Sequence, residues 1–138
     1  MVTGGDEPGK ALVANSDVNG ITFTGSYEVA MSIMRGYAAG GEFVKPVVAE
    51  MGGKNAVIVS RNADLETAAL GVMRSAFGAT GQKCSSCSRV YVHRDVKADF
   101  TEKLVELTKQ IKVGDPTQRE NYVGPLLNEV AYRAYQKY

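Results

Sequence analysis

The residue of this chain best suited to covalent chemistry is Cys84. It lies in a glycine-punctuated stretch, residues 78–89 (GATGQKCSSCSR), which leads into the apolar run 90–92. A thiol in a loop between two ordered elements has backbone N–H groups nearby that can stabilise a thiolate and receive an oxyanion. This placement predicts a nucleophilic cysteine. The alternative is that Cys84 and Cys87 are both small buried apolar side chains.

A second polar stretch, residues 49–55 (AEMGGKN), lies upstream between two apolar runs. Glu50 stands there at the end of a predicted strand, and Gly52 and Gly53 follow it. A carboxylate at a strand end followed by glycines can face a cavity and accept a proton from water. We therefore expect Glu50 to be a general base.

Three motifs together resemble the aldehyde dehydrogenase superfamily in content, order and spacing. They are FTGS at residues 23–26, EMGGKN at residues 50–55 and GQKC at residues 81–84. The resemblance extends over essentially the whole chain. It implies an α/β fold in which residues 1–51 are the C-terminal part of a Rossmann-like NAD(P)-binding domain. Residues 52–138 would then be the first part of an α/β catalytic domain that carries the nucleophile loop.

The resemblance also implies a reaction, the oxidation of an aldehyde to a carboxylic acid with NAD or NADP as cofactor. The Cys84 thiolate would attack the aldehyde carbon, and the adduct would pass hydride to the nicotinamide to leave a thioester. Glu50 would then activate the water that releases the acid. The N–H of Cys84 would be one oxyanion donor, while the family's second donor, an Asn side chain, would lie upstream of residue 1.

The first motif spans the end of a predicted strand and a Gly25-Ser26 turn, and a predicted helix follows it. The N-terminus of a helix in this arrangement can receive phosphate oxygens. Such turns also occur for packing reasons alone. With the resemblance, Gly25 and Ser26 are expected to contact the pyrophosphate of the cofactor. Val29 is expected near the adenine, and Gly52 is the fourth cofactor-binding residue that we carry over.

Lys83 and Ser85 flank the nucleophile, and the sequence around them is most similar to the 1-pyrroline-5-carboxylate dehydrogenases. In that branch the residues beside the cysteine help to hold the charged amino-acid end of glutamate γ-semialdehyde. A cation and a hydroxyl suit a carboxylate. The resemblance therefore implies this small-molecule aldehyde as the substrate. A solvated lysine and an ordinary loop serine are the alternative.

Two other functions remain open from the residues alone. Cys84 and Cys87 are separated by two residues, a spacing that also occurs in thiol redox proteins. A zinc site would need further ligands, since the chain has two cysteines and only His93 as histidine, so we expect no metal. The third possibility is a truncated, non-catalytic remnant or interaction module that keeps the motifs without the activity.

Alternating strand and helix patterns position these motifs and favour an α/β fold with a largely parallel sheet. Asp64 and Asp95 are expected to cap the helices that follow them. The helix over residues 65–77 is apolar on most sides, which predicts that it is buried. The predicted strands cover residues 21–24, 43–49, 56–59 and 89–92, and the predicted helices cover residues 10–15, 28–39, 65–77, 96–111 and 128–138.

Composition limits the class of protein. With 138 residues, 44% of them hydrophobic, and a net charge of +1, the chain can form one globular core and offers no argument for nucleic acid or a membrane surface. We expect a cytoplasmic protein with reduced thiols. Because a whole enzyme of this superfamily has further segments, we also expect the chain to be inactive alone. We expect it to associate with itself or with those missing parts.

Overall fold

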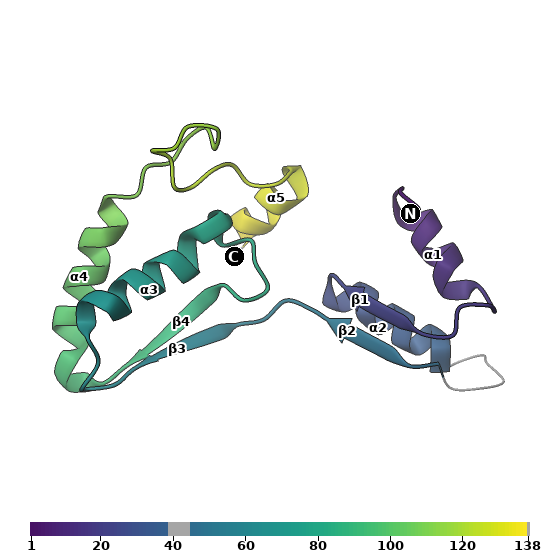
Figure 1. Cartoon of the computed structure of the whole chain (residues 1–138), viewed down its shortest axis with the longest axis horizontal. Helices are drawn as coiled ribbons and strands as arrows, with labels where there is room; N and C mark the ends of the chain where they lie inside the picture. Colours follow the sequence, from purple (N-terminus) through teal and green to yellow (C-terminus); the bar gives the residue numbers. More distant parts are fainter. Residues whose placement is uncertain (39–44, 138) are drawn as a thin grey trace. The chain divides into compact units, whose positions relative to one another are not determined.

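The computed structural model describes residues 1–38 and 45–137. The fold is α/β, and the chain divides into two compact units, Met1–Gly52 and Gly53–Tyr138 (Figure 1). Each unit contains a pair of parallel strands that are consecutive in the chain. A helix connects the two strands of each pair, which is the arrangement that parallel neighbours require.

The first unit is a β-α-β arrangement preceded by a helix. Its strands pair in register from Ile21 opposite Val47 to Thr24 opposite Glu50. Ala30 and Ile33, one helical turn apart, are its buried apolar side chains among the described residues. The elements are α1 (Asp6–Ala14), β1 (Ile21–Thr24), α2 (Tyr27–Ala38) and β2 (Val47–Glu50).

The second unit repeats the arrangement with a larger core. A register shift between Asn55 and Ala56 places them opposite Cys87 and Arg89, so Ser88 is skipped in the strand ladder. Its first elements are β3 (Asn55–Val59), α3 (Leu65–Phe77), the short 3₁₀ stretch η1 (Gly78–Gly81) and β4 (Cys87–Val92). The remaining elements are η2 (Arg94–Val96), α4 (Lys97–Lys109) and α5 (Glu129–Lys137). The buried core residues are Val59, Ala69, Val72, Cys87 and Phe100.

Helix α3 begins where the sequence predicts. The Asp64 carboxylate accepts a hydrogen bond of 2.8 Å from the N–H of Thr67, which is the expected N-cap. This bond stabilises the charged carboxylate and holds the pKa of Asp64 below its ordinary value. The cap therefore stabilises the fold above the ordinary pKa of an aspartate and is lost as the pH falls through the lowered value.

Four sequence-based expectations about the elements need correction. Helix α1 spans Asp6–Ala14, so it starts before the predicted helix 10–15. Asp95 caps no helix: it lies inside the η2 turn, where its N–H donates to His93 Nδ1, and Val96 is the N-cap of α4. Strand β2 begins at Val47; part of the predicted strand 43–49 and the end of the predicted helix 28–39 lie outside the described residues. In α3 only Ala69 and Val72 are buried.

The strand pair β3–β4 has one face covered by helices and one face open. Val57, Val59, Val90 and Val92 pack with the core formed with α3 and α4. Ile58 and Tyr91 are opposite each other in the register and point to the other face, where they are 80% and 56% exposed. The sheet thus presents an apolar surface on its outer side.

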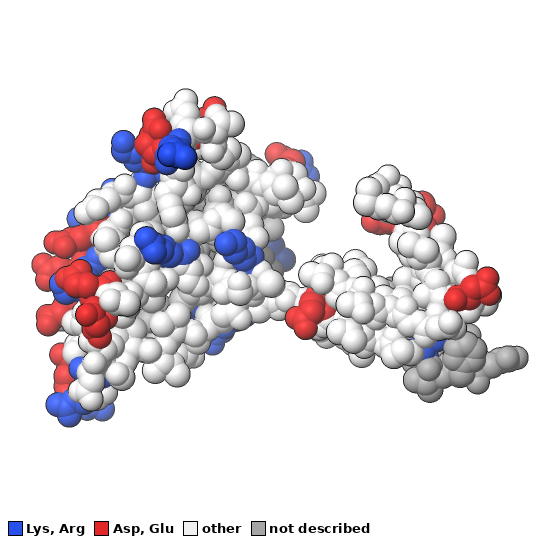
Figure 2. All heavy atoms as spheres, viewed as in Figure 1, with Lys and Arg blue, Asp and Glu red and all other residues white. Residues whose placement is uncertain are grey.

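Charged side chains of both signs mix over α4 (Figure 2). No helix among residues 1–38 and 45–137 is long and apolar enough to span a bilayer. Within the same residues, no three His, Cys, Asp or Glu side chains are grouped so that they could hold a metal ion.

Candidate active site

Cys84 is exposed at the tip of a hydrogen-bonded turn in the second unit. The N–H of Ser86 donates to the carbonyl of Lys83 over 3.2 Å, which makes Cys84 and Ser85 the central residues of the turn. Lys83 and Ser85 are exposed on either side of Cys84. In the described part of the chain, no hydrogen bond uses the N–H of Cys84 or Ser85. Both donors therefore stay available to an incoming oxyanion.

The side chain of Asn55, the first residue of β3, holds the turn from one side. Its Nδ2 atom lies 2.6 Å from the carbonyl oxygen of Cys84 and 3.1 Å from that of Ser86. Asn55 belongs to the EMGGKN motif, but no local pattern indicates a role for its side chain. The contact joins the two motifs across the strand pair.

The segment before the nucleophile is held from the C-terminal side of the unit. Thr80 Oγ1 donates to the carbonyl of Gly124 over 3.3 Å, and Gln82 Oε1 accepts from the N–H of Leu127 over 3.0 Å. Ala79, Thr80 and Gly81 have φ values of 51°, 59° and 69°, so three successive residues are left-handed. Such a run is costly for residues with a Cβ atom, and these hydrogen bonds help to maintain it.

Replacing Gly81 by alanine is expected to destabilise the second unit by about 1–2 kcal/mol, because a Cβ atom is disfavoured at positive φ. The new atom would also lie 3.0 Å from the carbonyl oxygen of Ala76. Urea unfolding followed by circular dichroism measures the change. Gly71→Ala is the matched control, since Gly71 lies in α3 with no atom near its Cβ position, and there alanine should stabilise by about 1 kcal/mol. Equal effects of the two changes would contradict the assigned geometry.

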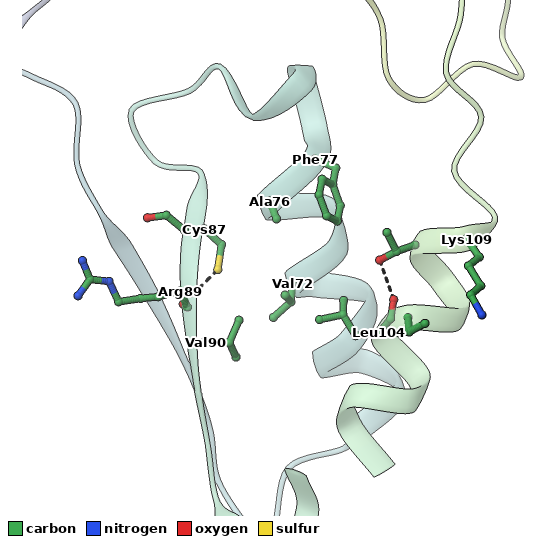
Figure 3. A pocket seen from close by; sticks show the side chains of 11 residues that line it. Val72, Ala76, Phe77, Cys87, Arg89, Val90, Leu104 and Lys109 are labelled. Carbon is green, nitrogen blue, oxygen red and sulfur yellow. Dashed lines mark hydrogen bonds between the residues drawn. The ribbon is translucent and has the colours of Figure 1, made fainter. Parts of the chain in front are cut away.

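Cys87 differs from Cys84 in its burial and packing. It is only 7% exposed and belongs to the core of the second unit. Its thiol points from β4 toward Val72 and Ala76 of α3 and donates to the carbonyl of Arg89 over 3.3 Å (Figure 3). It lines an apolar cavity of about 490 Å³ between β4, α3 and α4. Cys87 is therefore a packing residue, and both cysteines are free thiols.

Limiting iodoacetamide is expected to alkylate Cys84 about 10²-fold faster than Cys87, because Cys87 reacts only after the core opens locally. Mass-spectrometric mapping of the two peptides over time gives both rates. In denaturant the two rates should become comparable, which controls for intrinsic differences between the peptides. Preferential labelling of Cys87 in the folded chain would remove the basis for Cys84 as nucleophile.

The first unit brings the other predicted residues to the carboxyl ends of its two strands. The N–H of Gly25 donates to the carbonyl of Glu50 over 3.0 Å, and the Glu50 side chain is exposed at the end of β2. A Cβ atom at Gly25 would clash with the tip of the Phe23 ring, so a larger residue there would displace that ring. Carboxyl ends of parallel strands, next to a helix N-terminus, are where α/β proteins bind nucleotides.

Ser26 and Val29 open helix α2 at this end. Ser26 Oγ accepts from the N–H of Val29 over 3.3 Å, so the hydroxyl caps the helix. The Val29 side chain is 48% exposed and is free to contact a ligand. Ala30, by contrast, is wholly buried, so its methyl group packs inside the unit.

Gly52 ends the first unit, and a Cβ atom there would meet no other atom. Glu50, Gly25, Ser26, Val29 and Gly52 belong to the first unit, whereas Lys83, Cys84 and Ser85 belong to the second. The role of Glu50 as general base for a thioester on Cys84 therefore stays a prediction.

Comparison with known proteins gives consistent matches over the chain. Residues 1–138 match the Aldehyde dehydrogenase family. The chain is 44% identical over 137 residues to "1-pyrroline-5-carboxylate dehydrogenase 1" of Halalkalibacterium halodurans, covering 97% of this chain and 27% of that protein. It is 42% identical over 137 residues to the 1-pyrroline-5-carboxylate dehydrogenase of Bacillus subtilis, with the same coverage.

Solved structures agree. Proline utilization A from Bradyrhizobium japonicum (mutant D779W) has a TM-score of 0.93 and 38% identity, over 99% of this chain and 14% of that one. A 1-pyrroline-5-carboxylate dehydrogenase from Thermus, solved with bound NAD, has a TM-score of 0.86 and 33% identity, over 96% of this chain and 27% of that one. The chain thus spans about a quarter of the length of the curated relatives it matches. With its motifs and folded units agreeing over the full length, the chain belongs to the aldehyde dehydrogenase family.

Proposed function

We propose that these residues take part in the NAD(P)-dependent oxidation of an aldehyde to a carboxylic acid, with glutamate γ-semialdehyde as the substrate and glutamate as the product. The observation that carries the proposal is the exposed thiol of Cys84 on a turn whose N–H groups at Cys84 and Ser85 are unused. The names of the relatives support the choice of substrate.

Cys84 acts as the nucleophile. Its sulfur forms a bond to the aldehyde carbon, and the carbonyl oxygen becomes an oxyanion within reach of the unused N–H groups of the turn. A bound nicotinamide supplies the hydride acceptor for this oxidation. The oxyanion then returns to a carbonyl as hydride leaves the carbon, and Cys84 holds the acyl group as a thioester.

Glu50 completes the reaction as the general base. Its carboxylate takes a proton from water while the water oxygen attacks the thioester carbon. The carbon–sulfur bond then breaks, and Cys84 returns to the thiolate as the acid leaves. This role requires the two units to bring Glu50 and Cys84 to one site.

The carboxyl ends of β1 and β2 fit a dinucleotide cofactor, either NAD or NADP. The N–H of Gly25 is already bonded to Glu50, so the pyrophosphate would be received by Ser26 and the first N–H groups of α2. Val29 is exposed next to them and suits an adenine ring. Gly52 leaves open space beside the strand end. The first unit is accordingly proposed as part of the cofactor domain and the second as part of the catalytic domain.

Lys83 and Ser85 are proposed to recognise the charged end of the substrate. Both are exposed on either side of Cys84. An ammonium group and a hydroxyl can bind the α-carboxylate while the thiol meets the aldehyde. A cytoplasmic location, in which thiols remain reduced, keeps Cys84 available for this reaction.

The open face of β3–β4 supports association with further polypeptide, either a second copy or other segments of such an enzyme. Ile58 and Tyr91 expose apolar surface there, and the strand pair has open edges. Uncovered apolar faces and strand edges favour association.

A chimera tests the proposed function. The 137 matched residues of the Bacillus subtilis relative are replaced by those of this chain, and reduced cofactor is followed by absorbance with glutamate γ-semialdehyde. Cofactor reduction that depends on both the aldehyde and Cys84 is expected. A folded chimera that binds NAD or NADP but reduces neither would contradict the proposal. The parent enzyme and the isolated chain are assayed beside it.

A further inference from the structure

Asn55 makes a pair of contacts that the proposed mechanism does not use. Its side-chain amide carries two N–H donors, and the single Nδ2 atom is within hydrogen-bonding distance of the carbonyls of Cys84 and Ser86. One donor can therefore serve each carbonyl. Asn55 is half-buried at the start of β3, so its position is fixed by the strand ladder.

The bonds of Asn55 engage two of the carbonyl groups around the nucleophile. The Lys83 carbonyl accepts from Ser86, and the carbonyls of Cys84 and Ser86 accept from Asn55. Because a peptide unit is planar and trans, a Cys84 carbonyl directed at Asn55 sends the Ser85 N–H to the opposite side. Asn55 thus orients the N–H of Ser85 without contacting it.

Two local features make room for the amide. A Cβ atom at Gly53 would lie 3.0 Å from Asn55 Oδ1, so glycine at this position leaves the side chain space. The register shift directly after Asn55 skips Ser88, and such irregularities re-aim the side chains beside them.

We propose that Asn55 is a positioning residue, whose two amide donors hold the turn so that the Cys84 thiol and the neighbouring N–H groups are presented together. The proposal rests on the proposed role of Cys84 as nucleophile. An aspartate at this position would place carboxylate oxygens against two carbonyl oxygens, an alanine would offer no donor, and a serine would offer one.

The test measures the rate of Cys84 alkylation by iodoacetamide in the 138-residue chain at fixed pH, for Asn55→Ala, Asn55→Asp and Asn55→Ser. Loss of the donors should slow Cys84 by about fivefold, the factor expected for one ordinary hydrogen bond. Asn55→Ser should recover part of the rate. Carbonyl ¹³C shifts of Cys84 and Ser86 should change in the same variants, which reports the hydrogen bonds themselves.

Asn121→Ala is the matched control. Asn121 Nδ2 also donates to a loop carbonyl, that of Asp115 at 3.0 Å, in the same unit but in a different loop. This change should leave the Cys84 rate within about twofold, since it removes an equivalent bond elsewhere. Equal slowing by Asn121→Ala, or no slowing in folded Asn55 variants, would overturn the proposal. If Asn55→Ala fails to fold, Asn55→Ser decides.

The alkylation test separates this proposal from the proposed function, because it needs no aldehyde oxidation. A chimera without Cys84-dependent turnover, together with slowed alkylation in the Asn55 variants, would defeat the function alone. An active chimera with unchanged alkylation would defeat the role of Asn55 alone.

Discussion

Cys84→Ser in the chimera is expected to lower aldehyde-dependent cofactor reduction by about 10⁴-fold or more. A serine hydroxyl is a weak nucleophile without an adjacent base, and removing the group that forms the covalent bond removes the whole pathway. The steady-state rate with saturating cofactor and aldehyde measures the loss. Binding of the cofactor should persist, because its proposed residues lie in the other unit.

Cys87→Ser is the control for a change of the same kind. It places a hydroxyl in the core, so it should lower stability while the rate per folded molecule stays close to that of the parent chimera. Full activity in Cys84→Ser, with activity lost in a folded Cys87→Ser, would transfer the nucleophile to Cys87.

Glu50→Gln is expected to reduce steady-state turnover by about 10²–10³-fold while leaving the first turnover largely intact. A general base typically contributes a factor of this size, and here it acts only when water attacks the thioester. Rapid mixing should therefore show one equivalent of reduced cofactor per site, followed by a slow phase. Glutamine keeps the size of the side chain but cannot accept the proton.

Hydroxylamine provides a direct check of that assignment. This nucleophile needs no general base to attack a thioester, so it should restore much of the turnover of Glu50→Gln. Glu102→Gln, a change of an exposed carboxylate on α4, should leave the steady-state turnover unchanged. Loss of the first turnover together with the slow phase would place Glu50 in the oxidation step instead.

The sequence predicted helix bounds correctly where neighbouring residues set them. The bounds of α3 follow from the Asp64 cap and the glycine after Phe77, and the structure has the same bounds. Asp95 has the same residue type, but His93 caps the 3₁₀ turn η2, which places Asp95 inside that turn and starts α4 two residues later, at Lys97. The prediction that α3 is buried on most sides was wrong. Burial depends on which segments pack around a helix, and composition does not reveal them.

In the candidate site, too, local relations were predictable and contacts between distant residues were not. Cys84, Lys83 and Ser85 are neighbours in the chain, so their proximity needed no structure. Asn55 at the Cys84 carbonyl and Gln82 at the Leu127 N–H are contacts between distant parts of the sequence. A single sequence holds no signal for such pairs, even though Asn55 and Gln82 both lie in the motifs that identified the family.

The pairing of consecutive strands has a consequence for synthesis of the chain. In each unit a strand pairs with the next strand after one helix, so β1–β2 can form before β3 has left the ribosome. The nucleophile loop cannot be completed at that stage. Two hydrogen bonds that hold this loop go to Gly124 and Leu127, which are synthesised after α4. The thiol is therefore synthesised before the residues that hold its loop.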